Sequence, residues 1–565
     1  MATFDVRSTF AGRHVLLSGA TGFVGKVWLA MLLDRLPEIG HLYVLIRSKK
    51  RPAHERFERA LNTSPAFRPL HERFGADLSD YLERRLTVVE GDVSLPGLGI
   101  DPAVAAPLRK KLDLVVNFAG LVDFNPDLRD ALASNVEGAV HAADFVAACD
   151  HAALLHVSTC YVAGTREGRI PESLDPTRTP NGTPFDAERE LEHLHALVAD
   201  TVTAADDPAV HDEIREQIVA RLERRGLAPK ESRIRAMAAR LHRRRVKEAL
   251  IEAGTRRATE LGWPNTYTYT KALAEALLAA RAETIPVALF RPAIVESAES
   301  FPFPGWNEGF NTSGPLVYLA GTWLRHIPAK HYNKLDVIPV DHVARGLTTA
   351  AVALLHREHR LVYQCGTSDL RPLTMDRIFD LSALAHRKHL RTHGATKARR
   401  VLLSRWDITV STPEGLLSVR NIRRVVHQAN RFLRHGLPSK IPHEVREKAD
   451  ELAHTGENAE RRLRQIEDVM DLFQPFIHDH DFTFECRALR EVPIRDPAFR
   501  FDPASIDWRR YWMDVHMPGL RRWCFPEYEG KEREAYQAPH PVTVVRAEER
   551  FEIEPPRGAE EAARP

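Results

Sequence analysis

Two residues at a four-residue spacing are the strongest candidates for chemistry in this sequence. Tyr267 and Lys271 form the pattern Tyr-x-x-x-Lys within TYTYTKALAE. On a helix this spacing places both side chains on one face. A nearby ammonium group lowers the pKa of a phenol from its usual value of about 10. Tyr267 is therefore expected to donate a proton to a carbonyl oxygen while hydride reaches the carbon. Tyr269 lacks this spacing to Lys271 and is not expected to take part.

A pair of hydroxyl side chains, Ser158 and Thr159, follows a short apolar run at 154–157. A hydroxyl at such a strand end is expected to hydrogen-bond the substrate oxygen and the hydroxyl of Tyr267. The alternative interpretation is that the two residues only end the strand.

A glycine-rich loop, SGATGFVG at 18–25, lies between an expected strand and an expected helix. Glycines at three-residue spacing allow a tight turn, close approach of the backbone to a pyrophosphate, and close packing of helix on strand. The N–H groups at the start of the helix attract the anion. The loop is therefore predicted to bind a dinucleotide, and the alternative is a turn that only packs. The predicted cofactor contacts are Gly19, Thr21, Gly22, Phe23, Val24 and Gly25.

The residues that follow the next three strands refine this prediction. Arg47 follows the second strand, where a basic side chain suits the 2′-phosphate of NADP and an acidic one would suit NAD. Asp92 and Val93 follow the third strand, where a carboxylate can meet the adenine amino group. Ala119 and Gly120 follow the fourth, where small residues let the cofactor pass close to the sheet. The sequence thus favours NADP, and the alternative for Arg47 is a solvated basic turn.

The elements that must position these residues alternate between short apolar strands and helices over the first 160 residues. This alternation indicates βαβ units and an α/β fold with a doubly wound, Rossmann-type parallel sheet. The expected strands are 14–17, 42–46, 86–89, 112–116, 154–157, 287–290 and 336–340, with a helix over 26–36.

The pattern changes twice along the chain. A charged helical insertion is expected at 184–261, where apolar stripes such as Ile214, Ile218 and Leu222 predict amphipathic helices, divided into two near Gly226 and Pro229. The stripes either pack on the core or rest on a membrane surface. The insertion lies within a cofactor-binding domain at 1–368. A mainly helical C-terminal domain at 369–537 follows, with helices at 374–386 and 444–473 and then a loop-rich stretch containing Trp508 and Trp523. A Pro- and charge-rich tail at 538–565 is expected to be disordered.

Composition narrows the function classes. The chain has 565 residues, 44% of them apolar, and a formal net charge of +2, which argues against a nucleic-acid partner. No run of 18 uncharged apolar residues and no secretory signal is visible, and five scattered cysteines fit a reducing, cytoplasmic compartment. His478-Asp479-His480-Asp481 is interpreted as a polar turn, and no metal is expected.

Together these motifs resemble the extended short-chain dehydrogenase/reductase superfamily, and more specifically the fatty acyl-CoA reductases with their male-sterility-type NAD-binding domain. The resemblance covers about residues 10 to 360, with a weaker C-terminal part. The residues that carry it are SGATGFVG, LIRSKK, EGDV, HVSTCYV, WPNTYTYTKALAE, LFRPAIVES, FPFPGW, KLDVIPVDHVA and IDWRRYWMDVHMPGLRRW.

This resemblance implies reduction of a long-chain fatty acyl-CoA by NADPH to a primary alcohol through an aldehyde. Tyr267 and Thr159 would act on the carbonyl oxygen, with Ser158 as the alternative hydroxyl. Lys271 would tune Tyr267 and, like Tyr267, contact the cofactor, and Pro292 in LFRPAIVES would also contact it. Release at the aldehyde, a hydroxysteroid dehydrogenase, a nucleotide-sugar epimerase and a non-catalytic NADP-binding scaffold stay open as alternatives.

Some members of this family carry a C-terminal membrane anchor, and this chain resembles the soluble bacterial members instead. Its expected partner is the fatty acyl-CoA substrate, and the sequence carries no signal for an oligomeric state. Basic clusters at 240–247, 386–400 and 420–434 are either solvated helix faces or surfaces for CoA phosphates or for peripheral contact with an anionic membrane.

Overall fold

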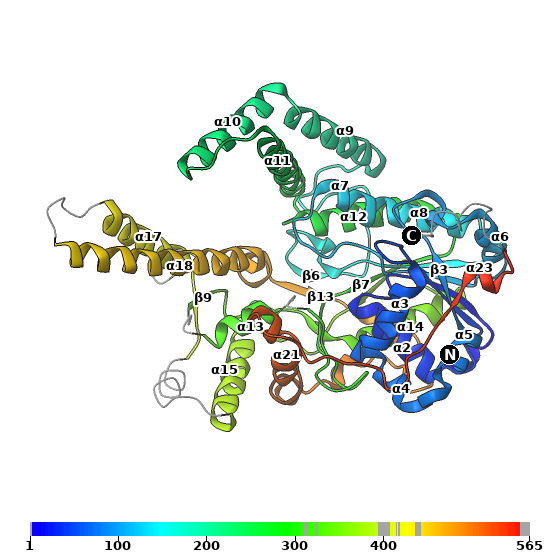
Figure 1. Ribbon diagram of the computed structural model, residues 1–565. Helices are drawn as coiled ribbons and strands as arrows, with labels where there is room; N and C mark the ends of the chain where they lie inside the picture. Colours follow the sequence, from blue (N-terminus) through cyan, green and yellow to red (C-terminus); the bar gives the residue numbers. More distant parts are fainter. Residues whose placement is uncertain are drawn as a thin grey trace.

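A parallel β-sheet forms the centre of the molecule (Figure 1). The structure is a computed structural model, and it describes residues 3–309, 313–322, 326–393, 407–413, 415, 418–435 and 442–553. In the described chain the strand order is β11-β7-β5-β4-β1-β2-β3-β14. Because the chain moves outward from β1 in both directions, the sheet is doubly wound, as predicted. Its strands are β1 (His14–Ser18), β2 (His41–Ile46), β3 (Leu86–Glu90), β4 (Leu114–Asn117), β5 (Ala153–Val157), β7 (Val287–Pro292), β11 (Val362–Cys365) and β14 (Val545–Arg546).

Both faces of the sheet are covered by helices, which explains why its strands are apolar almost throughout. Along β1, Val15 and Leu17 face one hydrophobic cluster and Leu16 faces the other, because successive side chains of a strand alternate in direction. The first cluster includes α2 (Phe23–Arg35) and α14 (Val340–Leu355), and the second includes α6 (Pro102–Lys111), α8 (Gly138–Ala147) and part of α12 (Thr266–Arg281).

Shorter elements complete this part of the fold. The helices are α1 (Val6–Phe10), α3 (Ala53–Thr63), α4 (Arg68–Phe74), α5 (Leu78–Arg85), α7 (Leu128–Ala131) and α13 (Gly314–Ala320). Small parallel pairs join β6 (Gly168–Ile170) to β13 (Phe482–Phe484), β8 (Ile294–Glu296) to β10 (Val337–Pro339), and β9 (His326–Pro328) to β12 (Thr409–Ser411).

The insertion folds as α9 (Ala187–Ala205), α10 (Pro208–Arg224) and α11 (Glu231–Glu260), which lie together beside α7 and α12 (Figure 1). The prediction of two helices missed the break before α10. There Asp207 caps the helix by accepting a hydrogen bond from Ala209 N, and Pro208 occupies the first turn. The predicted stripes of α10 and α11 are buried against each other in a cluster of their own, and contact of the insertion with a membrane stays a prediction.

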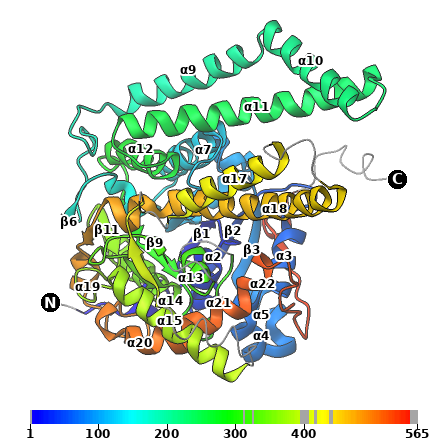
Figure 2. The ribbon, with the colours of Figure 1, turned by 90° about the vertical axis from the view of Figure 1, so that its left-hand side faces the viewer.

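The C-terminal region is mainly helical, and α17 and α18 form a hairpin that projects from the body (Figures 1 and 2). Its helices are α15 (Met375–Thr392), α17 (Val419–His435), α18 (His443–Gln474), α19 (Arg487–Glu491), α20 (Trp508–Arg510), α21 (Met517–Trp523) and α22 (Phe525–Tyr528). The stretch around Trp508 was predicted to be loop-rich and is helical instead. Asp507 caps its first helix, and the indole of Trp508 donates to Arg371 O. Side chains from both sides of residue 368 share one hydrophobic cluster, and the boundary there stays a prediction.

The predicted disorder from Ala538 is wrong for residues 538–553. Ala538 N donates to Asn62 O, and the Asn62 side chain exchanges two hydrogen bonds with the backbone of Val542. β14 then pairs parallel with β3, and α23 (Ala547–Arg550) follows. The unpaired backbone groups of an edge strand supply the partners that hold this segment. Residues 554–565 lie outside the described residues.

Within the described part of the chain, no helix combines the length and the apolar character needed to cross a membrane. All five cysteines are free thiols.

Candidate active site

The predicted cofactor and catalytic residues gather at one edge of the sheet, because the carboxyl ends of parallel strands meet there. Between β1 and β4 the order in which the chain adds strands to the sheet reverses, and such a switch point opens the crevice where dinucleotides bind. Around this edge lie Gly19, Thr21, Gly22, Phe23, Val24 and Gly25 after β1, Arg47 after β2, Asp92 and Val93 after β3, Ala119 and Gly120 after β4, Thr159 after β5, and Pro292 at the end of β7.

The glycine loop forms a backbone cradle that larger residues would fill. Gly19 has φ +70°, and a Cβ on it would lie 2.8 Å from the carbonyl carbon of Phe118. A Cβ on Gly25 would lie 2.5 Å from Gly19 O. Gly22 precedes α2, and no side chain of the described residues caps that helix. The first N–H groups of α2 therefore suit a bound anion, and the loop fits the pyrophosphate of a dinucleotide.

A cluster of polar side chains lies at the ends of β2 and β3. The Arg47 guanidinium, about half exposed, is 3.2 Å from Asp92 Oδ2. Burial raises the pKa of Asp92, but hydrogen bonds from Ser94 and the charge of Arg47 outweigh this and hold it below its usual value. The Ser48 hydroxyl is buried with no hydrogen-bond partner among the described residues. A buried hydroxyl without a hydrogen-bond partner destabilises the fold, so this site fits a ligand whose oxygen atoms can accept a hydrogen bond from it.

Helix α12 carries Tyr267 and Lys271, and Asn265 starts it by accepting a hydrogen bond from Thr268 N. Lys271 Nζ donates to Val157 O at 3.0 Å. Burial lowers the pKa of Lys271 to about 8, with the charge of Glu275 opposing the shift. A Cβ on residue 120 would lie 2.9 Å from Lys271 Nζ, so Gly120 makes room for the lysine.

The side chain of Thr159 lies next to the hydroxyl of Tyr267, and its Oγ1 accepts from Tyr161 N and donates to Pro292 O. Burial raises the pKa of Tyr267 to about 12, and the neighbouring Thr159 side chain opposes this only in part. This corrects the sequence-based expectation of a lowered pKa, because burial of the phenol disfavours its charged form. Tyr267 stays protonated at neutral pH, as a proton donor must. The neighbouring Ser158 hydroxyl is buried and has no partner in the described structure.

An asparagine that sequence reasoning missed links the two halves of this site. Asn135 lies in a π-helical turn between α7 and α8. Its side chain accepts from Leu121 N at 2.8 Å and donates to the Thr270 hydroxyl at 3.0 Å. It thus joins the loop after β4 to α12. Its burial is fully set by tertiary packing, so the sequence offered no signal for this role.

Aromatic side chains form an apolar wall beside Tyr267. The ring of Phe124 packs edge-on to Tyr267, with centroids 6.2 Å apart. Phe473 and Phe476 contact Phe124 at 6.2 and 5.6 Å. The helix that ends near Phe473 was predicted, but its contact with the site was not, because the sequence separation exceeds 300 residues.

Tyr269 has a different environment from Tyr267. Its hydroxyl donates to Glu190, which also binds the guanidinium of Arg257 through both carboxylate oxygens. This buried group joins α9, α11 and α12 and serves the fold.

The run His478 to Asp481 does not gather at one point in the described structure. His478 pairs with Asp479, His480 with Glu167, and Asp481 with Lys334. Its side chains hold neighbouring segments together.

A doubly wound parallel sheet, a glycine cradle at its switch point and a tyrosine–lysine pair on a helix beside it define a nicotinamide-dependent oxidoreductase of the short-chain dehydrogenase/reductase type. Residues 17–347 match the model of the male sterility protein family, and the chain belongs to that family.

Curated relatives share nearly the whole chain. Probable fatty acyl-CoA reductase 5 of Arabidopsis thaliana is 27% identical, over 90% of this chain and 96% of that protein. The alcohol-forming fatty acyl-CoA reductase of Simmondsia chinensis has the same identity and coverage. Among solved structures, the reductase domain of a nonribosomal peptide synthetase from Mycobacterium tuberculosis matches with a TM-score of 0.49 and 15% identity, over 92% of this chain and 93% of that one.

Proposed function

We propose that this protein reduces the thioester of a long-chain fatty acyl-CoA with NADPH and forms the primary alcohol through the aldehyde. The observation that carries the proposal is that Thr159 and Tyr267 lie next to each other at the sheet edge that also carries the glycine cradle, with an aromatic wall beside Tyr267. The alignment with fatty acyl-CoA reductases over 90% of the chain supports this substrate class.

Tyr267, Thr159 and Lys271 have different roles in the proposed reaction. A bound nicotinamide nucleotide supplies hydride. Tyr267 keeps its proton, with a pKa of about 12, until the carbonyl oxygen above it gains negative charge and takes that proton. Thr159 fixes the direction of the phenol hydroxyl. Lys271, held by Val157 O, places an ammonium group below the crevice, where it can bind a ribose hydroxyl. Hydride and proton turn the thioester into a hemithioacetal, whose C–S bond breaks to release the CoA thiol and leave the aldehyde. The aldehyde presents its carbonyl oxygen to Tyr267 in the same way, so one set of residues serves both reductions.

The preference for NADPH rests on Arg47 and Ser48, a cation and an unpartnered hydroxyl at the end of β2. For Arg47→Ala we expect KM for NADPH to rise roughly 10- to 100-fold, the equivalent of a lost charge-assisted hydrogen bond, with kcat little changed. KM for NADH should hardly change, because NADH lacks the 2′-phosphate. Steady-state kinetics with NADPH and NADH measure both KM values. An equal rise in KM for the two nucleotides would contradict the proposed preference for NADPH.

Thr159 and Ser158 can be separated by single variants. Thr159→Ala should lower kcat about 100-fold or more, as removal of a donor at a developing oxyanion does. Ser158→Ala should cost much less, because this hydroxyl has no contact with Tyr267 among the described residues. A larger loss of kcat in Ser158→Ala than in Thr159→Ala would show that Ser158 provides the catalytic hydroxyl.

One assay tests the proposed reaction as a whole. Acyl-CoAs from C8 to C20 are supplied, and NADPH oxidation and thiol release are measured together. Two NADPH per thiol is the result expected for alcohol formation. One NADPH per thiol would show that the enzyme stops at the aldehyde, and NADPH oxidation or epimerisation without thiol would contradict a thioester substrate.

A further inference from the structure

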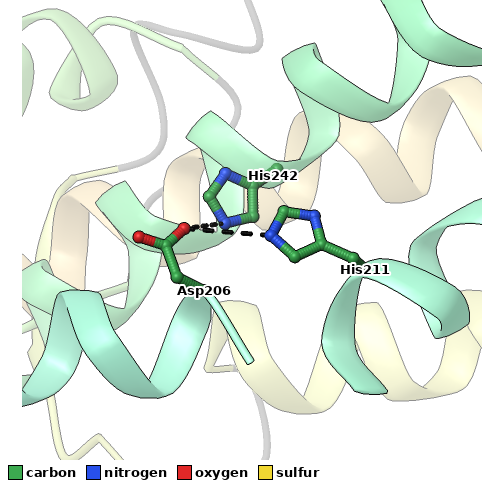
Figure 3. A group of neighbouring side chains, drawn as sticks. All are labelled: Asp206, His211 and His242. Atoms are coloured by element: carbon green, nitrogen blue, oxygen red, sulfur yellow. Dashed lines mark ion pairs between the residues drawn. The ribbon is translucent and has the colours of Figure 1, made fainter. Parts of the chain in front are cut away.

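The helical insertion holds three potential metal ligands at the point where its helices meet (Figure 3). Asp206 directly follows α9, His211 lies in the first turn of α10, and His242 lies within α11. The carboxylate and both imidazole rings turn toward one another (Figure 3). Asp206 Oδ1 is 3.0 Å from His242 Nε2 and 3.9 Å from His211 Nε2.

The geometry is close to that of an ion-binding site. The three ligand atoms lie within 4.8 Å of one another. Ligands bound about 2.0–2.2 Å from a tetrahedral Zn²⁺ are separated by roughly 3.3 Å. The pair Asp206–His242 nearly has this spacing already. The His211 side chain is half exposed and can rotate toward the same point.

The two imidazoles pack on each other and also direct their Nε2 atoms to the same carboxylate. Their rings stack with centroids 4.6 Å apart, and both Nε2 atoms converge on one carboxylate oxygen. His242 Nε2 also lies 3.0 Å from Ala205 O. Binding of an ion would replace that hydrogen bond and would place a backbone oxygen beside the metal. The neighbouring charges Glu213 and Arg245 are paired with each other.

We propose that Asp206, His211 and His242 bind a divalent transition-metal ion, with Zn²⁺ as the best match for two imidazoles and a carboxylate. The ion would tie the turn between α9 and α10 to α11. These outer helices have only a small apolar cluster of their own, built on Ile214 and Ile234. The role is structural, and the proposal does not rest on the proposed reductase activity. This site could not be predicted from sequence motifs, because its ligands are spread over 37 positions.

The test uses the full chain, purified without a polyhistidine tag and stripped of metal with EDTA. Zn²⁺ is titrated by calorimetry into the wild type, His211→Ala and Asp206→Asn. We expect one Zn²⁺ per chain to bind at this site, and each variant to weaken its affinity by more than about 100-fold, because loss of an outer hydrogen-bond partner alone typically costs about 10- to 100-fold. Hydrogen exchange of the backbone around residues 203–212 and 240–245 should slow when Zn²⁺ is added to the wild type.

His195→Ala is the matched control, because His195 is an exposed histidine on α9 that pairs with Glu137 outside the cluster. It should bind Zn²⁺ as the wild type does. Circular dichroism confirms that the variants are folded, which is expected because both altered side chains are half exposed. A wild type that binds no Zn²⁺, variants with wild-type affinity, or exchange protection confined to other helices would each overturn the proposal.

Discussion

Tyr267→Phe should lower turnover by about 10²- to 10⁴-fold, the usual contribution of a positioned proton donor. The phenylalanine ring keeps the edge-on contact with Phe124 and loses only the hydroxyl that meets Thr159. Binding of NADPH should therefore stay close to the wild type. Turnover is measured from thiol release with a saturating acyl-CoA, and nucleotide binding is measured separately by fluorescence titration.

Tyr269→Phe is the natural control, because it removes a hydroxyl two positions away on the same helix. That hydroxyl binds Glu190, which keeps its contacts with Arg257. We expect a loss of stability of about 1–3 kcal/mol and nearly full activity. If Tyr267→Phe works at the wild-type rate, or if the two variants lose activity equally, Tyr267 is not the proton donor.

Glu275→Ala should lower the free energy of unfolding by about 3–5 kcal/mol, because it leaves a buried guanidinium without its partner. Glu275 lies on α12, and its carboxylate binds Arg291 on β7 through both oxygens. The exposed fractions of the two side chains are 0% and 5%. The pair fixes the helix that carries Tyr267 to the sheet. Urea unfolding followed by circular dichroism gives the loss.

The double variant Glu275→Leu/Arg291→Met separates two contributions to the free energy of unfolding: the loss caused by an unpaired buried charge and the net stabilisation by the ion pair. Replacing a buried ion pair with apolar residues of similar size is often neutral or stabilising. The double variant should therefore recover most of the stability that Glu275→Ala loses, apart from the bond between Arg291 and Ser173 O. A single variant within 1 kcal/mol of the wild type would show that water reaches Arg291.

Local patterns predicted the part of the site that is built from neighbouring residues. The turn from β1 into α2 follows from three glycines at three-residue spacing, and the spacing of Tyr267 and Lys271 is a property of one helix. The C-terminal wall at Phe473 could not be predicted, because it depends on how the α17–α18 hairpin docks across the chain. The raised pKa of Tyr267 was missed for a related reason: burial is set by tertiary packing, which no spacing rule contains.

The strand β14 gives this protein a particular order of assembly during its synthesis. The edge strand β3 leaves the ribosome about 455 residues before β14, its last neighbour in the sheet. At 5–20 residues per second, this is a delay of roughly 20–90 s. During that time β3 presents an open edge that can pair with other nascent chains. We therefore expect the dependence of folding on chaperones to be strongest before residue 545 is made. We also expect fusion proteins in which β14 cannot pair to aggregate through the open edge of β3.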